Sequence, residues 1–589
     1  MQDSVEVICL ITIWTKLMIK VTDLIAKILA NSGVKSCFGL QGGAVVHIFD
    51  SLEKEGVDVY YMHHEQSASL ASVANSKTTG ELGCTVVTTG PAGTNAITGL
   101  LAAWQDSIPV VYLSGQVRSM HTSYGKKVRQ VGTQEAPILE LIKPITKYAK
   151  LLDSADDIFI EVKKAIYIAK SGRPGPVWLD IPLEVQWAMV RDPSFAELIQ
   201  PVFKDDSSNT NQSFDDAIEL LESAKKPLLI LGYGVHLSKS RDLLESIIEK
   251  YDLSYVTTWT ASDLFPTLDE RNLGVIGMSG QRGANKAIFM ADLLVCIGTH
   301  LSIPHTTTLT DSYAPQAKKI IINIDNEQLE HLNINFDLKI KTDISVFAKF
   351  LDGKNLNIES YKFDGLKALN WYDPPITPKI NSNIYIRKLS ILNKVNTCYV
   401  VDGGGTALYS GFHALNFKKG DRVICSSAIS SMGTGLAETV GSYASKIYKK
   451  YVTIIGDGSF LMNVQDLQSI FQYQIPAIIL VVNNNGYLAI RNTQREFLSG
   501  KYYGTHPDWG LVMPSIERIA GAFEIDYLRI ETYEDMEISF PRILEETLGP
   551  IIVELITDES QQVLFSQGYK ANNDGTFSPS PLSEMKPFT

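Results

Sequence analysis

Short apolar runs rich in β-branched residues alternate along the chain with helical patterns of apolar residues, and this alternation recurs in three separate stretches. Runs of this kind, bounded by glycine, proline and acidic turn residues, are typical of parallel strands that helices cover on both faces. We therefore predict an α/β protein with three doubly wound parallel-sheet domains. The predicted strands span 84–89, 110–114 and part of 172–182 in the first third, 227–231, 293–297 and 319–324 in the middle third, and 398–402, 452–456, 477–483 and 550–555 in the last third.

Two polar stretches separate these three parts of the chain. Residues 205–212 contain few apolar side chains, and residues 352–381 enclose Pro374-Pro375, so both are interpreted as linkers. An amphipathic helix is predicted to follow Met18, and the residues before it are expected to take no part in the fold. The predicted organisation is an extension at 1–17, a first domain at 18–186, a central domain at 213–351, a third domain at 384–570 and a C-terminal tail at 571–589.

The composition is that of a large globular protein. At about 150 residues per domain, a chain of 589 residues is expected to form three or four domains. Hydrophobic residues make up 45% of the chain and charged residues 20%, which supplies several cores and argues against bulk disorder. The chain has 53 Lys and Arg against 65 Asp and Glu, and the resulting net charge of −12 opposes attraction to nucleic acid or anionic lipid.

The cysteines and the N-terminal segment favour a cytoplasmic, soluble protein. The six cysteines lie far apart and form no C-x-x-C pair, so we expect reduced, mostly packed thiols rather than a zinc site or a redox loop. Residues 7–14 are apolar but too short to span a bilayer, and acidic residues precede them, which argues against a signal peptide. We expect neither nucleic acid nor a membrane as a partner.

The most informative motif is Gly456-Asp457-Gly458-Ser459, followed some two dozen residues later by Asn483-Asn484. Each group directly follows a predicted strand, and open α/β sheets bind ligands at the carboxyl ends of their parallel strands. A carboxylate and an amide oxygen suit Mg²⁺, and the glycines allow the backbone to approach a phosphate. A simpler interpretation is that the first group is an ordinary turn and the second an ordinary loop.

This pairing resembles the diphosphate- and Mg²⁺-binding motif of thiamine diphosphate (ThDP) enzymes. The resemblance extends over nearly all of the chain from Met18 to about residue 560, and it implies pyrimidine-binding, central and diphosphate-binding domains. It also implies that Asp457, Asn484 and Gly486 hold Mg²⁺. The ThDP-binding residues that it implies are Glu65, Gly405, Thr406, Met432, Gly433, Gly456, Asp457, Gly458, Ser459, Asn484, Gly486 and Tyr487.

A second motif lies in the first domain, where His64-Glu65-Gln66 opens a helix of small residues and the segment from Gly90 to Asn95 follows a strand. These segments are similar to those of the pyrimidine-binding domain in the acetolactate synthase branch of the family. In that branch a carboxyl group with a raised pKa holds a proton at the aminopyrimidine N1′, which favours the imino form that generates the thiazolium ylide. Glu65 is the predicted catalytic acid, and the alternative is a solvated carboxylate that only favours the helix dipole.

The resemblance assigns roles to two further residues. Met432 stands where the family places a bulky apolar residue beneath the cofactor, although a methionine is equally suited to filling a core. Gln134 is predicted to be catalytic and to hydrogen-bond the reaction intermediate, with an ordinary surface glutamine as the alternative. In this family Glu65 and Asp457 approach one cofactor from different subunits, so a homodimer or homotetramer is implied.

The sequence around these motifs is similar to acetolactate synthases, as in the run from Gly456 to Asp466. The implied activity is that of a carboligase, which decarboxylates a 2-keto acid, most simply pyruvate, and transfers the acyl unit to a carbonyl acceptor. Thr493 stands where that branch has a Trp that shapes the acceptor pocket, and Thr406-Ala407 replaces Gln-His. These departures indicate a different or larger acceptor.

His300 replaces an Arg that this branch associates with FAD, so FAD binding is left open, and the lone Gly232-Tyr233-Gly234 is weak evidence for a dinucleotide. Residues 485–494 and the ending 581–588 look like a sub-branch linked to surface-sugar pathways. The alternative function is therefore two-carbon transfer to a nucleotide-linked keto-sugar. Simple 2-keto acid decarboxylation and a non-catalytic scaffold are two further alternatives, and the intact candidate site argues against the scaffold.

Overall fold

A computed structural model describes residues 18–200, 211–308, 310, 313–371, 373–374, 377–545, 549–563, 565–572, 574 and 576–587. The described chain forms two compact units. Unit 1 contains the described residues up to 200 together with 436–447 and 465–473, and unit 2 contains the rest. The extension predicted at 1–17, with its apolar stretch and Cys9, and most of the linker predicted at 205–212 lie outside the described residues.

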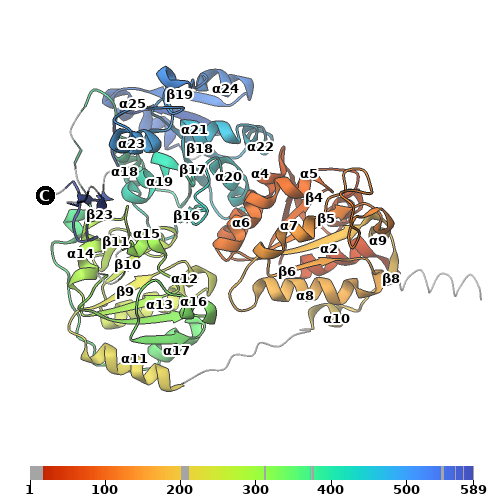
Figure 1. The fold of residues 1–589 in the computed structure, drawn as a ribbon, viewed down its shortest axis with the longest axis horizontal. Helices are drawn as coiled ribbons and strands as arrows, with labels where there is room; N and C mark the ends of the chain where they lie inside the picture. The colour runs from red at the N-terminus through yellow and green to blue at the C-terminus, as the bar shows by residue number, and fades with distance from the viewer. Residues whose placement is uncertain are drawn as a thin grey trace, which may run out of the picture. The chain divides into compact units, whose positions relative to one another are not determined.

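Unit 1 is built on a parallel six-stranded sheet. Helices α2 (Val21–Asn31) and α8 (Ile158–Lys170) lie on one side of it, and α4 (Glu65–Thr79) and α6 (Ile97–Gln105) on the other (Figure 1). The strand order is β3 (Asp58–Tyr61), β2 (Ser36–Gly39), β4 (Gly83–Val87), β5 (Val110–Gln116), β7 (Val177–Pro182) and β6 (Tyr148–Leu151). A short antiparallel pair joins β1 (Met18–Lys20), which precedes the six strands in the sequence, with β8 (Met189–Arg191), which follows them.

Two helices from the last third of the chain also belong to unit 1, namely α20 (Gly435–Tyr443) and α22 (Asp466–Gln472). Asn75 Nδ2 of α4 donates a hydrogen bond to the Gly441 carbonyl at 3.2 Å. A Cβ at Gly441 would lie 2.0 Å from the carbonyl oxygen of Ala71, so only glycine permits this approach of the two helix backbones.

Unit 2 contains two more six-stranded parallel sheets. The central sheet has the order β11 (Asn272–Val275), β10 (Tyr255–Thr257), β9 (Pro227–Leu231), β12 (Leu293–Ile297), β13 (Lys318–Asn323) and β14 (Leu338–Lys341). The other sheet has the order β16 (Arg422–Ile424), β15 (Thr397–Val401), β17 (Lys450–Gly456), β18 (Ala477–Asn483), β20 (Ile551–Ile556) and β19 (Asp526–Ile530). Three doubly wound parallel sheets confirm the predicted fold class.

The remaining helices connect these strands. In unit 1 they are α3 (Val46–Lys54), α5 (Pro91–Asn95), α7 (Ile138–Ile142), α9 (Leu183–Gln186) and α10 (Phe195–Ile199). In unit 2 they are α11 (Asn211–Ser223), α12 (Gly234–Leu237), α13 (Arg241–Tyr251), α14 (Arg282–Met290), α15 (Ile303–Thr306), α16 (Asn326–Glu330), α17 (Ile344–Asp352), α18 (Ser382–Leu392), α19 (Gly405–Ala414), α21 (Asp457–Met462), α23 (Leu488–Phe497), α24 (Ile516–Ala522) and α25 (Tyr533–Ile543).

Every predicted strand overlaps an observed one, and β9, β12 and β18 have the predicted bounds. Within the three six-stranded sheets, the strands that the sequence did not predict are β2, β3, β6, β10, β11, β14, β16 and β19, and six of these eight are at sheet edges. Edge strands are short and covered on fewer sides, so they lack the continuous apolar run that identified the central strands.

The end of the described chain packs onto unit 2. Strand β21 (Ser566–Gln567) pairs with β24 (Met585–Lys586), and β22 (Tyr569–Ala571) pairs with β23 (Phe577–Pro579). Leu582 contributes to the core beside the central sheet, and Met585 is buried against Phe565. The segment predicted as a tail therefore carries packed side chains.

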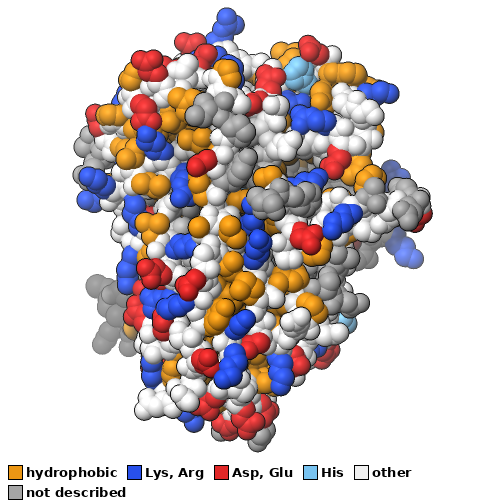
Figure 2. All heavy atoms as spheres, turned by 90° about the vertical axis from the view of Figure 1, so that its left-hand side faces the viewer, with side chains coloured by type: hydrophobic (Ala, Val, Ile, Leu, Met, Phe, Trp, Pro, Cys, Tyr) orange, Lys and Arg blue, Asp and Glu red, His pale blue; other side chains and the backbone are white. Residues whose placement is uncertain are grey.

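The charged side chains at the surface and the cysteines are arranged as the composition of the chain led us to expect. Figure 2 shows acidic and basic side chains interspersed with apolar ones over the face that it presents. The five cysteines within the described residues are buried, and no disulfide joins them. Among the described helices, none has the length and apolar character needed to cross a bilayer.

A buried charge cluster joins the two sheets of unit 2. Arg422, which opens β16, contacts Asp263 at 2.6 Å, and Asp263 contacts His236 Nε2 at 2.9 Å. Burial opposes ionisation of Asp263, but Arg422 and then His236 lower its pKa. The Asp263 side chain is fully buried and that of Arg422 is 8% exposed, so neither charge can be hydrated if its partner is removed.

We expect Asp263→Asn to destabilise unit 2 by about 3–5 kcal/mol, because the substitution leaves the Arg422 charge buried and unpaired. Urea unfolding of the two proteins, followed by tryptophan fluorescence, measures the change. Asp252→Asn, which breaks the exposed pair with Lys362, is the matched control and is expected to unfold like the wild type. Equal unfolding midpoints for Asp263→Asn and the control would contradict this expectation.

Candidate functional site

Asp457 lies at the carboxyl end of β17, where the backbone leaves the strand and begins α21. Its carboxyl group is buried and accepts hydrogen bonds from two backbone amides, Gly486 N at 2.8 Å and Gly458 N at 3.0 Å. Burial raises the pKa of Asp457 to about 7, and these amides act in the opposite direction. The bond to Gly486 joins the two loops that the sequence motif predicted to be neighbours.

Arg491 fixes the loop after β18 by hydrogen bonds to the loop backbone. This arginine is 2% exposed, although it lies in the amphipathic helix α23. Its guanidinium donates to the carbonyl oxygens of Asn484 at 2.6 Å, Asn485 at 3.0 Å and Thr505 at 2.9 Å. Burial lowers the pKa of Arg491. Arg491 therefore fixes the backbone that presents Asn484 and Gly486, and sequence analysis missed it.

The glycines of the motif have different surroundings. A Cβ at Gly458 would lie 2.2 Å from Cε1 of Tyr487, whose ring packs directly on this residue. Gly486 has φ of 129°, and a Cβ there would lie 2.4 Å from the Thr505 carbonyl oxygen. In contrast, a Cβ at Gly456 would meet no atom within 4 Å. The backbone at Gly456 therefore borders open space that a phosphate could approach.

A buried aspartate connects this site to the glycine-rich loops that follow β15 and precede α20. Asp402 accepts hydrogen bonds from Gly435 N at 3.0 Å and Gly404 N at 3.2 Å, and it also bonds to the Ser459 side chain. Burial raises the pKa of Asp402 to about 6. Its position at the end of a predicted strand was a signal that sequence analysis did not use.

Of the predicted residues, Met432 and Gly433 lie on the loop that precedes α20, and Gly405 and Thr406 begin α19 directly after the loop that follows β15. A Cβ at Gly404 would lie 2.3 Å from Cγ of the half-buried Met432, and a Cβ at Gly433 would lie 2.8 Å from Cβ of Met462 in α21. The loops therefore pack on one another and on α21, while Gly405, with φ of 67°, borders open space.

The oxygen atoms near Asp457 fit a magnesium ion better than a softer metal. Within the described residues no group of three or more His, Cys, Asp or Glu side chains is placed to hold a metal. Asp457 offers one carboxylate, and the buried Asn484 adds an amide oxygen on the loop that Asp457 contacts. One carboxylate with neutral oxygens and room for phosphate is the coordination that Mg²⁺ commonly has in proteins.

In unit 1 the structure joins the two motifs of the first domain. Glu65 is 9% exposed at the first position of α4, and its Oε2 accepts a hydrogen bond from Asn95 Nδ2 at 3.0 Å. His64 is the N-cap of this helix, where its Nδ1 accepts from Gln66 N at 3.1 Å. His64 therefore has a structural role as the helix cap, and Asn95 is a second polar group at Glu65.

The two remaining candidates, Gln134 and Thr493, have exposed side chains. Gln134 is exposed on the segment between β5 and α7 of unit 1. Thr493 is exposed on α23, where its hydroxyl donates to the Ala489 carbonyl at 3.4 Å. Glu65 and Gln134 belong to unit 1 and Asp457 and Thr493 to unit 2, so their approach across two copies of the chain stays a prediction.

The turn Gly232-Tyr233-Gly234 at the end of β9 packs against the loop that follows β12. The amides of Gly232 and Gly234 donate to the carbonyls of Ile297 and Gly298, both at 2.9 Å. A Cβ on either glycine would lie 2.4 to 2.7 Å from backbone atoms of Gly298. Loop packing thus accounts for these glycines without a bound dinucleotide.

Asp466, which ends the run that resembles acetolactate synthases, is fully buried at the start of α22. Among the described residues, neither of its carboxyl oxygens has a hydrogen-bond partner. Burial raises the pKa of Asp466 to about 7. The carboxyl group is therefore more easily protonated in the folded protein than in the unfolded chain.

We expect the cofactor-free protein to lose stability as the pH rises from about 4 to about 7, because Asp466 must ionise without a partner in the folded state. Asp466→Asn removes this ionisation, so its free energy of unfolding at pH 8 should exceed that of the wild type by up to about 4 kcal/mol. At pH 4 the two proteins should be equally stable. Asp156→Asn, an exposed position in the same unit, is the control, and identical pH profiles for all three proteins would contradict the expectation.

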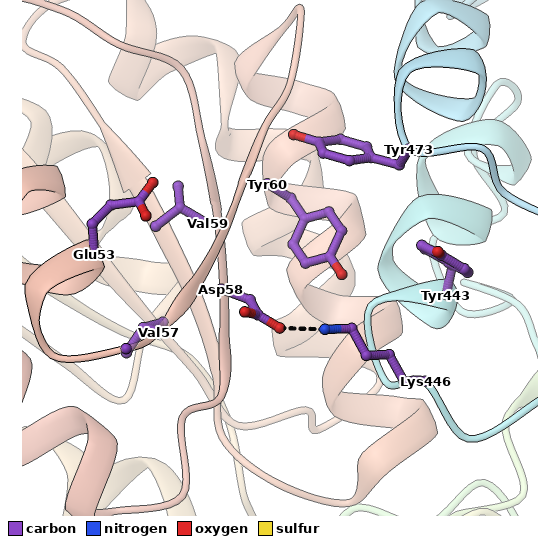
Figure 3. A pocket seen from close by; sticks show the side chains of 9 residues that line it. Glu53, Val57, Asp58, Val59, Tyr60, Tyr443, Lys446 and Tyr473 are labelled. Atoms are coloured by element: carbon purple, nitrogen blue, oxygen red, sulfur yellow. Dashed lines mark hydrogen bonds and ion pairs between the residues drawn. The ribbon is translucent and has the colours of Figure 1, made fainter.

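Unit 1 also has a hollow of about 500 Å³ at its edge strand β3 (Figure 3). Asp58 and Lys446 pair across it at 2.6 Å, and the phenol of Tyr473 accepts a hydrogen bond from the Tyr61 backbone amide at 2.8 Å. The polar groups there thus pair with one another, and Tyr473 covers part of the exposed strand edge. None of the predicted site residues lines this hollow.

Comparison with known proteins adds independent findings. Models of the N-terminal TPP binding domain, the central domain and the C-terminal TPP binding domain of thiamine pyrophosphate enzymes match residues 19–139, 214–351 and 402–555. Thiamine pyrophosphate is another name for ThDP. The chain is 28% identical to the acetolactate synthase large subunit of Haemophilus influenzae, over 92% of this chain and 95% of that protein. It is 30% identical to the probable acetolactate synthase large subunit of Methanocaldococcus jannaschii, over 92% of each chain.

Proposed function

The chain belongs to the thiamine diphosphate enzyme family, in its acetolactate synthase-like branch, and we propose that it is a Mg²⁺-dependent carboligase. In this proposal it decarboxylates a 2-keto acid, pyruvate in the simplest case, and transfers the acyl unit to a carbonyl acceptor. The observation that supports it best is the hydrogen bond between Asp457 and Gly486, which unites the two halves of the motif in one buried site.

Asp457 and Asn484, with the backbone at Gly486, would hold Mg²⁺, and the open backbone at Gly456 would face the diphosphate. Bound ThDP supplies the electron sink that decarboxylation of a 2-keto acid needs. Arg491 keeps the metal-binding loop in place, and Asp402 fixes the glycine-rich loops next to it. These residues bind and orient the cofactor.

Glu65 would hold a proton at the pyrimidine ring, with Asn95 orienting its carboxylate. Gln134 would donate or accept a hydrogen bond at the substrate. In keeping with the resemblance to ThDP enzymes, we propose that Glu65 and Asp457 of each site come from two different copies of the chain, which requires at least a homodimer.

Incubation of the purified protein with pyruvate, ThDP and Mg²⁺ tests the proposal. Acetolactate formation with release of CO₂ is the expected result, and omission of Mg²⁺ or ThDP should abolish it. Release of CO₂ with acetaldehyde as the product would instead identify a decarboxylase. No consumption of any 2-keto acid, with ThDP bound, would favour a non-catalytic protein.

A second candidate is two-carbon transfer to a nucleotide-linked keto-sugar. It is favoured by Thr493, whose small hydroxyl side chain is exposed on α23 and leaves more space than a Trp. Pyruvate consumption that depends on an added nucleotide-linked keto-sugar, without acetolactate, would support it. The proposed reaction has no flavin step, and an absorbance spectrum of the purified protein tests whether a flavin is bound.

A further inference from the structure

The segment from Val117 to Pro137 carries Gln134 and has a backbone conformation that neighbouring residues impose. Gln134 has φ of 60°, which is uncommon for a residue with a side chain. Its carbonyl oxygen lies 3.4 Å from Thr89 Oγ1, and a Cβ at Gly90 would lie 2.0 Å from the same oxygen. The exposed Gln134 side chain is thus presented by a backbone that is fixed against the end of β4.

Beneath this segment, Gln116 at the end of β5 contacts both of its ends. The buried Gln116 side chain accepts from the backbone amide of Val117 at 2.9 Å, where the segment begins. Its Nε2 donates to the carbonyl of Ala136 at 3.4 Å, where the segment ends. Because the Val117 amide can only donate, it fixes Oε1 as the acceptor end of this side chain, and Oε1 also accepts from Thr89 Oγ1 at 2.9 Å.

Asp180 of β7 holds Gln116 and the middle of the segment at the same time. Its Oδ2 accepts from Gln116 Nε2 at 3.0 Å and from the phenol of Tyr124 at 3.2 Å. Its Oδ1 accepts from Ser114 Oγ at 2.5 Å. Tyr124 in turn accepts from the backbone amide of Leu139 in α7 at 3.3 Å. One fully buried carboxyl group therefore fixes the start, the middle and the end of the segment.

The chemistry of these contacts explains why a carboxylate is buried at this place. Three donors converge on two oxygens, and only an ionised carboxylate accepts on both of them without contributing a donor. An Asn side chain of the same shape would turn an NH₂ group towards at least one of the three donors. Burial raises the pKa of Asp180 to about 6, so its ionisation costs free energy that the donors partly offset.

We propose that Asp180 is a positioning residue, which acts through Gln116 and Tyr124 to hold the segment 117–137 so that Gln134 meets the substrate. This inference rests on the role proposed above for Gln134. Asp180 itself lies beneath the segment and would touch neither substrate nor cofactor.

Tyr124→Phe tests this inference, because it removes one contact to Asp180 and leaves Gln116 unchanged. Loss of a hydrogen bond to a charged group should lower kcat/KM for the 2-keto acid about 10- to 100-fold, with ThDP affinity unchanged. In a Gln134→Ala background the same change should have no further effect, because the two residues act in series. Hydrogen exchange of amides 117–137 should also become faster in Tyr124→Phe.

Tyr148→Phe is the matched control, since it removes a phenol that bonds to the carboxylate of Glu161 elsewhere in unit 1, and it should behave like the wild type. Asp180→Asn should show the same effects as Tyr124→Phe, but larger. If Asp180→Asn does not fold, the result for Tyr124→Phe alone tests the role of Asp180. Wild-type activity of Tyr124→Phe beside an impaired Gln134→Ala would overturn the role of Asp180 only. Full activity of Gln134→Ala would overturn the role proposed for Gln134, and this inference with it.

Discussion

Asp457→Asn is expected to lower the affinity for ThDP and Mg²⁺ about 100-fold or more and to abolish turnover at ordinary cofactor concentrations. The substitution keeps the size of the side chain and an oxygen that can accept from the Gly486 amide. It removes the charge that balances a divalent ion. Isothermal titration calorimetry of the cofactor-free protein with ThDP, at saturating and at zero Mg²⁺, measures the loss directly.

The Asp457→Asn experiment can distinguish loss of metal binding from loss of folding. Asn loses the contact with the Gly458 amide, but because burial raises the pKa of Asp457 to about 7, the uncharged side chain should still leave the cofactor-free protein folded at neutral pH. Asp526→Asn, an exposed position at the start of β19 in the same sheet, should bind the cofactor like the wild type. Undiminished, Mg²⁺-dependent binding of ThDP to Asp457→Asn would contradict the metal assignment for this residue.

The strands that could be predicted from the sequence are those buried on both faces of their sheet. Strands such as Ala477–Asn483 are apolar on both faces, because helices cover both sides of a parallel sheet, and their bounds were predicted correctly. The four-residue strands Ser36–Gly39 and Asp58–Tyr61 were missed, since a run of that length has no periodicity that distinguishes a strand from a loop.

Some residues of the candidate site could be predicted from the sequence, and others could be identified only from their packing in the structure. Asp457 and Asn484 follow predicted strands, so parallel topology alone brings their loops together. Arg491 could not be found in this way. Its helix is amphipathic and gives no sign that this arginine is buried, and only the three loop carbonyl groups that it contacts explain its burial. The same holds for Asp180, whose three donors, Ser114, Gln116 and Tyr124, lie 56 to 66 residues before it in the sequence.

Glu65→Gln is expected to lower kcat about 100-fold or more while ThDP still binds, because Gln keeps the shape but cannot hold and release the proton. Gln can still accept the hydrogen bond that Asn95 donates to Glu65, so the start of α4 should stay folded. Steady-state kinetics with pyruvate, calorimetry with ThDP and a thermal unfolding scan give the three readings needed. Glu55→Gln, an exposed position in the same unit, is the control, and wild-type turnover in Glu65→Gln would refute the proton-holding role.

A mixing experiment with the same variant tests whether Glu65 and Asp457 meet across two copies of the chain. When Glu65→Gln and Asp457→Asn chains are dissociated and reassociated at random, half of the dimers are mixed. If each site takes Glu65 from one chain and Asp457 from the other, every mixed dimer has one intact site of two. About a quarter of the wild-type activity should then return, although neither variant is active alone. If both residues of a site came from one chain, no mixed dimer would have an intact site and mixing would restore nothing.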